Sequence, residues 1–577
     1  MHANSRGSLL IWAGLALVAA LGPAAAAAVD QRPNVIFLLA DDLGYGDLGA
    51  HGNPRLRTPN LDRLRAGSVS FTDHHVAPMC TPSRSELLSG ISAFRNGASA
   101  VAQGRSIVRR ELPLLPAIFR ENGYATAHFG KWHLGDNYPF RPQDRGFDLS
   151  IHGNGFGISS LADFWLNDSQ DDHYWRNDTL REFKGYNTDV FFNEAMDWMG
   201  RQARPFLVYL ATTASHEPFY VASKHVKPYE DLPPALAAFY GITAELDENV
   251  GRLLDYLDRH DLTRNTIVIY MTDNGTVERT GFYSAGMRGR KGSLYEGGHR
   301  VPFFLRWPAG PTGPAREIST LTHGVDLLPT LVDLCGLSAR LPEAPDGLSL
   351  RPLLQGRAEA FEARKLVVQF GAEFKDWDCA VLWNRWRLVK GAELYDLAAD
   401  PGQQHDLAAM RPEVVATLRA AYESWLGPTR QVMNRANYIV VGSPAEDPTR
   451  LSAADWIGPY CGEWGEYKES AAPKFGHWDI EAGMTGTYEI RLYLFPPESA
   501  TPLNQSFRNV PARPVAGAEL QLDDGKSTIQ TAPAAVFARF EIPLRQGERH
   551  RIEGRFLDAA GRPLWGATYL LIHPLQH

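Results

Sequence analysis

The stretch that most constrains the fold is the apolar run Val35–Ala40, which stops abruptly at Asp41-Asp42. Continuous rather than alternating hydrophobicity is typical of a strand that is buried on both faces, as in a parallel sheet covered by helices. Three later apolar runs also end in polar residues, and segments with helical spacing, such as 235–260, separate the runs. The chain is therefore predicted to have an α/β fold with a large, mostly parallel central sheet flanked by helices.

The later apolar runs lead to side chains that can do chemistry. The run 124–129 leads to Lys131 and His133, the run 206–210 leads to His216, and the run 266–270 leads to Asp273-Asn274. Because α/β sheets bind ligands at the carboxyl ends of their strands, we expect all four polar clusters on one rim of the sheet. Each cluster alone could be a turn, a cap or a solvated loop, but that alternative requires four unrelated accidents.

Oxygen ligands dominate the predicted rim. Hard oxygen donors, with no thiolate or imidazole among them, are contributed by Asp41, Asp42, Asp273 and Asn274. Such a set favours calcium or magnesium over zinc. The sequence therefore predicts a site for a hard divalent cation at this edge of the sheet.

Cationic side chains are predicted at the same rim. Lys131 follows one strand, and Lys291 lies in the glycine-flanked segment 286–292, which can approach a ligand closely. A divalent cation combined with Arg84 and these two lysines can hold a tetrahedral oxyanion. The expected ligand is thus a sulfate or phosphate ester, with His133 and His216 available for proton transfer.

The pentapeptide Cys80–Arg84 reads C-T-P-S-R and lies where a loop is predicted to enter a helix. Pro82 stands at a favoured first-turn position. The first turn of a helix offers unpaired N–H groups and partial positive charge, which suit an anion and an activated nucleophile. The alternative interpretation is a buried free cysteine beside a surface arginine.

Several of these segments are specific enough to resemble a known family. The blocks are R-P-N-V-I-F-L-L-A-D-D-L-G-Y-G-D, C-T-P-S-R, G-K-W-H-L-G, T-D-N-G and R-K-G-S-L-Y-E-G-G-H-R-V-P. Over roughly 32–426 the chain resembles a type I, formylglycine-dependent sulfatase of the alkaline phosphatase superfamily, with an arylsulfatase-like pattern. The resemblance implies that a separate maturation enzyme converts Cys80 to Cα-formylglycine.

The resemblance also implies roles for individual residues. One calcium ion would be bound by Asp41, Asp42, Asp273 and Asn274, with residue 80 close to the ion. Arg84 would hold the oxygens of the modified residue, and Lys131 and Lys291 would bind sulfate oxygens. His133 would face the modified residue, and His216 would lie near the leaving oxygen.

The implied reaction begins with hydration of the aldehyde to a geminal diol. One hydroxyl, whose proton passes to a neighbour such as Asp273, attacks sulfur. His216, helped by Lys291, protonates the departing oxygen, and His133 then removes the second hydroxyl's proton to expel sulfate. The resemblance thus implies a sulfuric ester hydrolase that releases inorganic sulfate from a sulfated carbohydrate or an aryl sulfate.

Two other functions are compatible with the same residues. A phosphodiester or phosphonate monoester hydrolase could use the same scaffold, and a protein with unmodified Cys80 could bind sulfated glycans without catalysis. The presence of both histidines argues against a protein that only binds, because binding does not require two groups for proton transfer.

The chain departs from the family pattern after the cysteine motif. The segment 88–91 reads L-S-G-I, so Ile91 stands where many family members carry an arginine.

Composition and segment patterns predict the domain organisation. At 577 residues the chain exceeds one ordinary core. The predicted parts are a signal peptide (1–28), the α/β catalytic domain (29–340), a small subdomain of antiparallel sheet plus helix (341–428), an aromatic-rich linker (429–476) and a β-sandwich-like accessory domain (477–577). The predicted helix of the small subdomain spans 412–426 and ends at Gly427-Pro428.

Export is predicted from the N-terminus. A short apolar run, Leu9–Leu21, follows one positive charge and precedes A-x-A sites, which is typical of a cleavable secretory signal. We therefore expect a periplasmic or secreted protein without stable membrane insertion. The net charge of −8 argues against a nucleic-acid partner. Cys80, Cys335, Cys379 and Cys461 show no framework spacing, and the oligomeric state stays open.

Overall fold

The structure is a computed structural model that describes residues 32–277, 282–341, 345–467 and 472–575. The predicted signal peptide, residues 1–28, lies outside the described residues. Arg32–His577 forms one compact unit. Within the described ranges, no helix combines the length and the apolar character that a membrane crossing requires.

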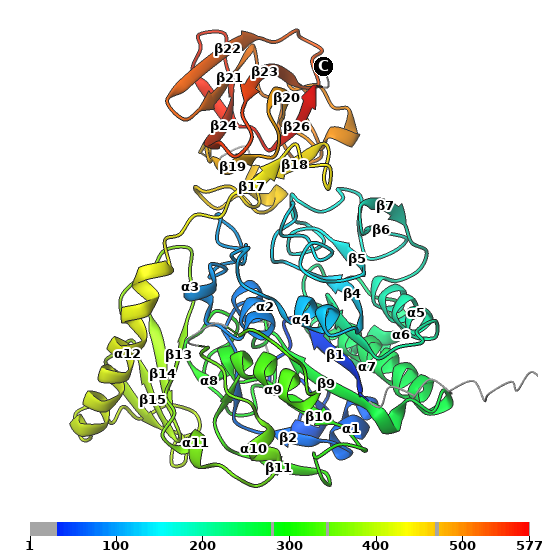
Figure 1. The fold of residues 1–577 in the computed structure, drawn as a ribbon, viewed down its shortest axis with the longest axis vertical. Helices are drawn as coiled ribbons and strands as arrows, with labels where there is room; N and C mark the ends of the chain where they lie inside the picture. The colour runs from blue at the N-terminus through cyan, green and yellow to red at the C-terminus, as the bar shows by residue number, and fades with distance from the viewer. Residues whose placement is uncertain (1–31, 278–281, 342–344, 468–471, 576–577) are drawn as a thin grey trace, which may run out of the picture. The chain divides into compact units, whose positions relative to one another are not determined.

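A ten-stranded sheet forms the centre of the catalytic region (Figure 1). Its strands, in order across the sheet, are β11 (Arg316–Ile318), β2 (Val69–Phe71), β10 (Phe303–Arg306), β9 (Thr266–Thr272), β1 (Asn34–Ala40), β8 (Phe206–Ala211), β4 (Ala125–Lys131), β5 (Leu149–Gly153), β6 (His173–Arg176) and β7 (Thr179–Glu182). The central strands β9-β1-β8-β4-β5 are parallel, whereas β10 and β6 run antiparallel to their neighbours. The α/β prediction with a mostly parallel centre is confirmed.

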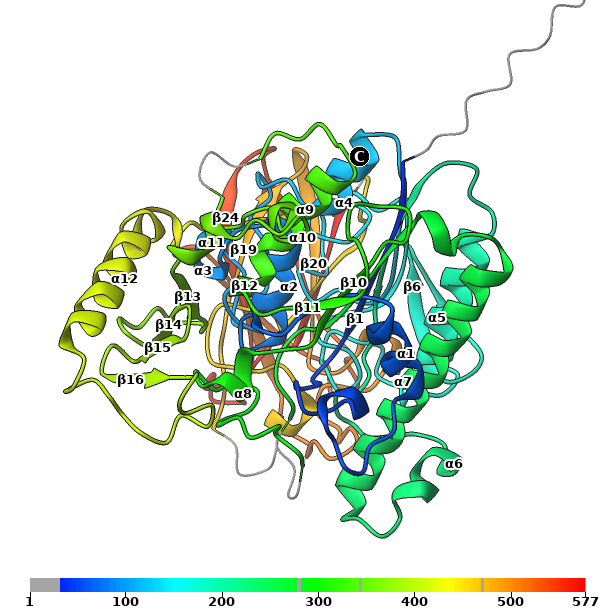
Figure 2. The same ribbon diagram turned by 90° about the horizontal axis from the view of Figure 1, so that it is seen from below.

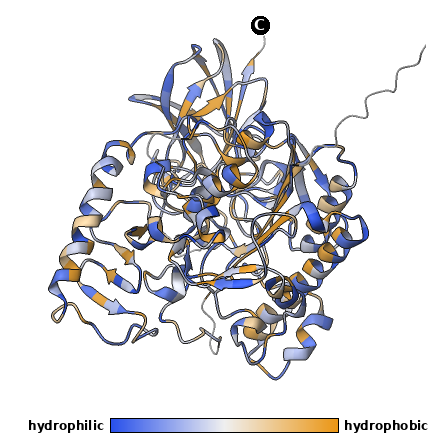
Figure 3. Ribbon diagram, turned by 60° about the horizontal axis from the view of Figure 1, so that its bottom comes forward, coloured by the Kyte–Doolittle hydropathy of each residue, from blue (hydrophilic) through white to orange (hydrophobic). Residues whose placement is uncertain are grey.

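Helices cover both faces of this sheet, as the continuous apolar runs predict. In β1, Val35, Phe37 and Leu39 join one core, and Ile36, Leu38 and Ala40 join the other. The first core is covered by α2 (Cys80–Ser89), α4 (Leu115–Glu121) and α9 (Leu327–Leu334), and the second by α1 (Pro59–Ala66), α5 (Asn187–Met199) and α7 (Pro234–Arg259). Figure 2 shows α5 and α7 together on one side of the strands, and Figure 3 shows hydrophobic colour on central strands and on the helices around them. Burial on two faces explains why these strands carry no alternation.

Short elements connect these layers. They are α3 (Ala93–Asn96), α6 (Ser223–Val226), α8 (Glu296–His299), α10 (Arg351–Leu354) and α11 (Glu359–Glu362), together with the paired strands β3 (His74–His75) and β12 (Thr322–His323). The four cysteines are all buried and free, so none of them forms a disulfide.

The small subdomain is a four-stranded antiparallel sheet with one long helix. The strands are β13 (Leu366–Gln369), β14 (Cys379–Trp383), β15 (Trp386–Val389) and β16 (Glu393–Asp396). The helix α12 spans Pro412–Val432, so the predicted end at Gly427-Pro428 is wrong. Both of those residues are exposed, while Leu426 and Thr429 on either side are buried. Packing of these neighbours outweighs the one hydrogen bond that proline removes.

The C-terminal region consists of two sheets, in agreement with the predicted sandwich. One contains β17 (Ile439–Val441), β19 (Trp478–Ala482), β24 (Arg549–Leu557), β21 (Gly517–Leu522) and β22 (Gly525–Gln530), with β25 (Pro563–Gly566) beside β24; the other contains β18 (Thr449–Ser452), β26 (Tyr569–Leu575), β20 (Gly486–Tyr493) and β23 (Ala538–Leu544). The predicted linker 429–476 therefore supplies a strand to each sheet. Trp456 and Tyr467 from that segment are buried in the sandwich core.

Candidate functional site

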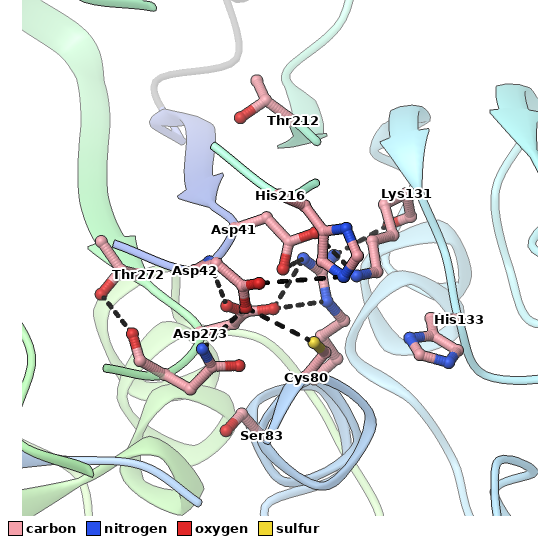
Figure 4. Close-up of polar contacts among 12 residues, drawn as sticks. Asp41, Asp42, Cys80, Ser83, Lys131, His133, Thr212, His216, Thr272 and Asp273 are labelled. Carbon is pink, nitrogen blue, oxygen red and sulfur yellow. Dashed lines mark hydrogen bonds and ion pairs between the residues drawn. The ribbon is translucent and has the colours of Figure 1, made fainter. Parts of the chain in front are cut away.

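The parallel order β9-β1-β8-β4 brings the four strand ends together. Ala40 at the end of β1 pairs with Thr272 at the end of β9, so Asp41 and Asp273 emerge side by side. Lys131 is the last residue of β4, so the strand extends beyond the predicted apolar run 124–129. Figure 4 shows these side chains converging with His216 above the first turn of α2. We call this group of side chains the strand-end site.

Cys80 is the first residue of α2, as predicted. Met79 before it is extended, and all ten residues of the helix are buried. The Cys80 Sγ atom lies 3.8 Å from Asp42 Oδ1. Burial raises the pKa of the Cys80 thiol to about 12. A free thiolate is therefore disfavoured at neutral pH, so the helix N-terminus does not create an activated thiol here.

Arg84 is fixed by its neighbours and is not a surface residue. Its Nε and Nη2 atoms donate to Asp273 Oδ2 at 2.9 and 2.8 Å. Its Nη1 atom donates to the Lys131 carbonyl at 3.0 Å. The fully buried guanidinium thus spans two strand ends, and its fork geometry is held in one orientation.

Two lysines neutralise two of the carboxylates. Lys131 Nζ donates to Asp41 Oδ2 at 2.7 Å, and Lys291 Nζ donates to Asp42 Oδ2 at 2.6 Å. Burial opposes ionisation of Asp41, yet Lys131 and Arg84 overcome it and hold the pKa of that carboxyl well below its usual range. In the same way, Lys291 holds the pKa of Asp42 below its usual value against the effect of burial.

Two oxygen atoms of the strand-end site are left without a hydrogen bond within the described part of the chain. They are Asp41 Oδ1, which lies 3.5 Å from the Arg84 guanidinium, and Asn274 Oδ1. Buried polar atoms are normally paired, so each calls for an explanation. Ligand atoms of Asp41, Cys80 and Asp273 all lie within 4.8 Å of one another. The predicted oxygen donors therefore fit a hard divalent cation.

The two histidines have different free nitrogens. His133 Nε2 lies 3.0 Å from the Val101 carbonyl and must donate to it, which leaves the Nδ1 lone pair free. His216 Nδ1 donates to the Glu217 carbonyl at 2.6 Å, and its Nε2 lies 3.8 Å from Asp42 Oδ2. Burial lowers the pKa of both imidazoles, that of His216 to about 4.

The described side chains of the strand-end site differ in their exposure. The side chains of Asp41 and Arg84 are completely buried, whereas those of His216 and Lys291 are 19% and 17% exposed. We therefore call the region next to His216 and Lys291 the open side of the site, from which a substrate can approach.

Backbone conformation at the site is also unusual. Asp42 and His133 adopt left-handed φ angles of 60° and 58°. Such conformations cost about 1 kcal/mol or more for residues other than glycine and concentrate at functional sites. Both residues were predicted to act at the rim, so this strain coincides with the predicted chemistry.

Sequence reasoning missed one aromatic residue at the opening. The Phe156 ring lies 6.1 Å from the His133 ring and 6.0 Å from the His216 ring, measured between centroids. It belongs to the segment G-N-G-F-G after β5. The sequence signal that could have identified Phe156 is an aromatic residue between two glycines after a strand.

Comparison with known proteins points to one family. The family model described as Sulfatase matches residues 33–337, and the model described as N-sulphoglucosamine sulphohydrolase, C-terminal, matches residues 289–424. The chain is 34% identical over 503 residues to human N-acetylgalactosamine-6-sulfatase, covering 76% of this chain and 92% of the relative. It is 30% identical over 466 residues to human arylsulfatase A, covering 69% and 89%. The solved structure of Ps i-CgsB in complex with k-i-k-neocarrahexaose is similar with a TM-score of 0.63 and 25% identity, covering 70% of this chain and 95% of that one.

Proposed function

The chain belongs to the sulfatase family and is an enzyme that hydrolyses sulfate esters, and on this premise we propose that it removes sulfate from a sulfated carbohydrate. The proposal includes one bound calcium ion and a formylglycine made from Cys80. Two comparisons support the carbohydrate: a relative is named for a sulfated amino sugar, and the similar Ps i-CgsB structure contains a neocarrahexaose.

The observation that carries the metal proposal is the pair of unsatisfied oxygens, Asp41 Oδ1 and Asn274 Oδ1. Calcium would be bound by Asp41, Asp42, Asp273 and Asn274, and it would supply positive charge next to residue 80 and the sulfuryl oxygens. Oxygen donors alone, without an imidazole, make zinc a poor alternative.

The lysines are positioned to contact the sulfate group. Lys131 and Lys291 now pair with carboxylates that calcium would also neutralise. Their ammonium groups are then available to sulfate oxygens without leaving a buried carboxylate uncompensated. Lys291 is part of the open side, so its ammonium group can meet the substrate as it enters.

The geminal diol of a formylglycine at residue 80 would supply the attacking oxygen and allow sulfate to be eliminated afterwards. Arg84, fixed by Asp273 and the Lys131 carbonyl, is positioned to orient that diol. Burial and the neighbouring Asp41 carboxylate raise the pKa of Asp273 to about 7. A bound calcium ion would lower that pKa, so Asp273 would accept a hydrogen bond from the diol and take its proton only as the hydroxyl attacks sulfur.

Proton transfer is divided between the histidines. The free Nδ1 lone pair of His133 can accept a proton from residue 80. His216 borders the opening, where the leaving oxygen of the substrate must lie. Burial lowers the pKa of His216 to about 4, and its Nδ1 proton is donated to Glu217, so Nε2 must gain a proton before His216 can act as a general acid. The negative charge of a bound sulfate ester would favour that protonated form.

Conversion of Cys80 by a maturation enzyme must precede folding. Residue 80 is 2% exposed, and every residue of α2 is buried, so an enzyme cannot reach the thiol in the folded chain. We therefore propose modification of the unfolded chain during export to the periplasm or the exterior. Ile91 stands where many family members carry an arginine. Its side chain is also buried, at 2% exposed, just after the end of α2.

A matched pair of aryl esters, together with one sugar sulfate, tests the proposal. The purified protein is given 4-nitrophenyl sulfate, 4-nitrophenyl phosphate and 6-O-sulfated N-acetylgalactosamine, and the release of each anion is measured. We expect turnover of both sulfate esters, with faster hydrolysis of the aryl sulfate than of the aryl phosphate. Faster phosphate hydrolysis would assign the site to phosphoesters, and binding without release of either anion would indicate a non-catalytic glycan-binding protein.

A further inference from the structure

The loop that carries Phe156 is built for a fixed position. Gly155 and Gly157 on either side adopt left-handed φ angles of 58° and 104°. A Cβ atom at Gly155 would come within 2.3 Å of Ser160 Oγ, so the turn requires glycine. The Gly155 N–H also donates to Asp136 Oδ2 at 2.8 Å. The loop thus presents Phe156 from a constrained turn.

Phe156 stands at the open side of the strand-end site. Its ring approaches the rings of His133 and His216 at 6.1 and 6.0 Å, and it is only half-buried. His216 is one of the two site residues that remain partly exposed. A sulfate group held by the buried cations leaves the rest of its molecule at this opening, next to Phe156.

We propose that Phe156 is a substrate-contact residue whose ring packs on the apolar face of the sugar that carries the sulfate ester. The proposal rests on the proposed function, because it assigns the group beyond the sulfate. An aromatic ring offers a large apolar surface with little conformational freedom to lose, which suits the C–H face of a pyranose. Free sulfate has no such face, so Phe156 discriminates between sugar sulfates and the bare anion.

The C-terminal sandwich holds the Phe156 loop in place. The Leu161 N–H donates to the Gly462 carbonyl at 2.8 Å, and the Tyr569 hydroxyl in β26 donates to the Leu161 carbonyl at 2.8 Å. Ser160 and Glu463 form an isolated antiparallel bridge. The sandwich is therefore a positioning element for this wall of the site, although it contributes no residue to the strand-end site itself.

Binding measurements on the full chain carrying Cys80→Ser test the contact without catalysis. Calorimetry compares 6-O-sulfated N-acetylgalactosamine with inorganic sulfate in the parent, Phe156→Ala and Phe156→Tyr. Loss of an aromatic contact is expected to weaken binding of the sugar sulfate about tenfold. Phe156→Tyr keeps the ring and is expected to bind it within about twofold of the parent. Inorganic sulfate should bind equally to all three.

Two results would overturn the contact. If Phe156→Ala binds the sugar sulfate as the parent does, the ring does not touch the sugar. If it loses affinity for inorganic sulfate to the same degree, Phe156 acts through the histidines. Failure of the proposed function would be seen in a different experiment, as the absence of sulfate release by the protein without the Cys80→Ser substitution. A parent chain that binds inorganic sulfate but not the sugar sulfate also contradicts the contact.

A matched pair of tyrosines tests the positioning role. Tyr569→Phe removes the hydroxyl that donates to Leu161, and Tyr488→Phe removes a hydroxyl that donates to the Met484 carbonyl at the same distance, 2.8 Å, within the sandwich. We expect Tyr569→Phe to weaken sugar-sulfate binding about threefold without changing that of inorganic sulfate. Tyr488→Phe should change neither. Equal effects of the two variants, or no effect of Tyr569→Phe, would contradict the positioning role.

Discussion

Among the described residues, two clusters of metal-ligating side chains meet the same geometric test but differ in their access to solvent. In the strand-end site, ligand atoms of Asp41, Cys80 and Asp273 lie within 4.8 Å of one another, and the group His75–Glu296–His299 satisfies the same limit. We call the second group the α8 cluster, because Glu296 and His299 lie on α8. Ligand distance alone therefore does not identify a metal site.

Each cluster pairs its acids with a buried guanidinium, Arg84 in the strand-end site and Arg387 in the α8 cluster, so charge alone does not separate the two. In the α8 cluster, the Arg387 guanidinium donates to Glu296 Oε1 and to Asp73 Oδ1, each at 2.8 Å. His75 Nδ1 meets His299 Nδ1 at 2.9 Å, and its Nε2 lies 2.9 Å from Asp73. The Arg387 guanidinium thus balances Glu296 and Asp73.

The α8 cluster has a structural role. Arg387 belongs to β15 of the small subdomain, whereas Asp73 and Glu296 belong to the catalytic region. The ion pairs therefore fasten the subdomain to the catalytic region.

Both clusters keep a buried oxygen without a hydrogen bond, Asp41 Oδ1 in the strand-end site and Glu296 Oε2 in the α8 cluster, so this feature does not separate them. The strand-end site differs in that two of its side chains, His216 and Lys291, are partly exposed. The difference teaches that access from solvent, and not buried charge alone, distinguishes a functional site.

Replacement of Cys80 is expected to have the largest effect on the strand-end site. Cys80→Ser should reduce kcat on 4-nitrophenyl sulfate by about 10⁴-fold or more, because serine can attack sulfur but cannot expel sulfate afterwards. The melting temperature should stay within a few degrees of the parent. Catalytic turnover near the parental rate would show that residue 80 is not the nucleophile.

Removal of the proposed calcium ion is expected to have the second-largest effect, and it distinguishes the strand-end site from the α8 cluster. A chelator should lower kcat/KM about a thousandfold, and Ca²⁺ should restore it where Zn²⁺ does not. Added Ca²⁺ should also raise the melting temperature of the chelated protein. Asp42→Asn is expected to abolish that rise, and Glu296→Gln to preserve it. The reverse pattern would place the ion in the α8 cluster.

Removal of Arg387 should affect stability and not chemistry. Arg387 is 1% exposed, so Arg387→Met leaves Glu296 and Asp73 as buried, uncompensated acids. The expected cost in the free energy of unfolding is about 3–5 kcal/mol. The control Arg385→Met breaks the half-exposed pair with Asp396 and should cost less than about 1 kcal/mol. Denaturant titration measures both, and a lower kcat of the folded Arg387→Met protein would contradict the assignment.

Acid should destabilise the α8 cluster by a smaller amount. Burial opposes ionisation of Glu296, yet Arg387 overcomes it and lowers the pKa from its ordinary 4.5 to about 2. Glu296 therefore contributes stability above pH 4.5 that is lost as the pH falls toward 2. The loss is at most about 3 kcal/mol. Unfolding measured between these pH values should be less pH-dependent in Glu296→Gln, and an equal pH dependence would contradict the sign.

The strand-end site was largely predictable because its signals are local. Asp41, Asp273 and Lys131 lie at or next to the end of a strand that is buried on both faces, and parallel pairing such as Ala40 with Thr272 then places the strand ends together. Continuous hydrophobicity predicts the strands. The rule that α/β sheets bind ligands at the carboxyl ends of their strands then predicts where the site lies. Neither step needs knowledge of tertiary contacts.

The remaining features depend on distant contacts. Arg387 meets Asp73 across more than three hundred residues, and nothing near either residue signals the other. Phe156 lies in a loop whose position is set by hydrogen bonds to the C-terminal sandwich. The strand Ile439–Val441 is too short to show alternation, and its pairing with β19 decides its conformation.

The central claim is that the strand-end site hydrolyses sulfate esters with a modified residue 80. Mass spectrometry of the tryptic peptide that contains residue 80, prepared from protein made in its native host, tests this claim most directly. The account predicts an aldehyde in place of the –CH₂SH side chain, with a mass that corresponds to formylglycine or its hydrate. An intact thiol at residue 80 in active protein would contradict it.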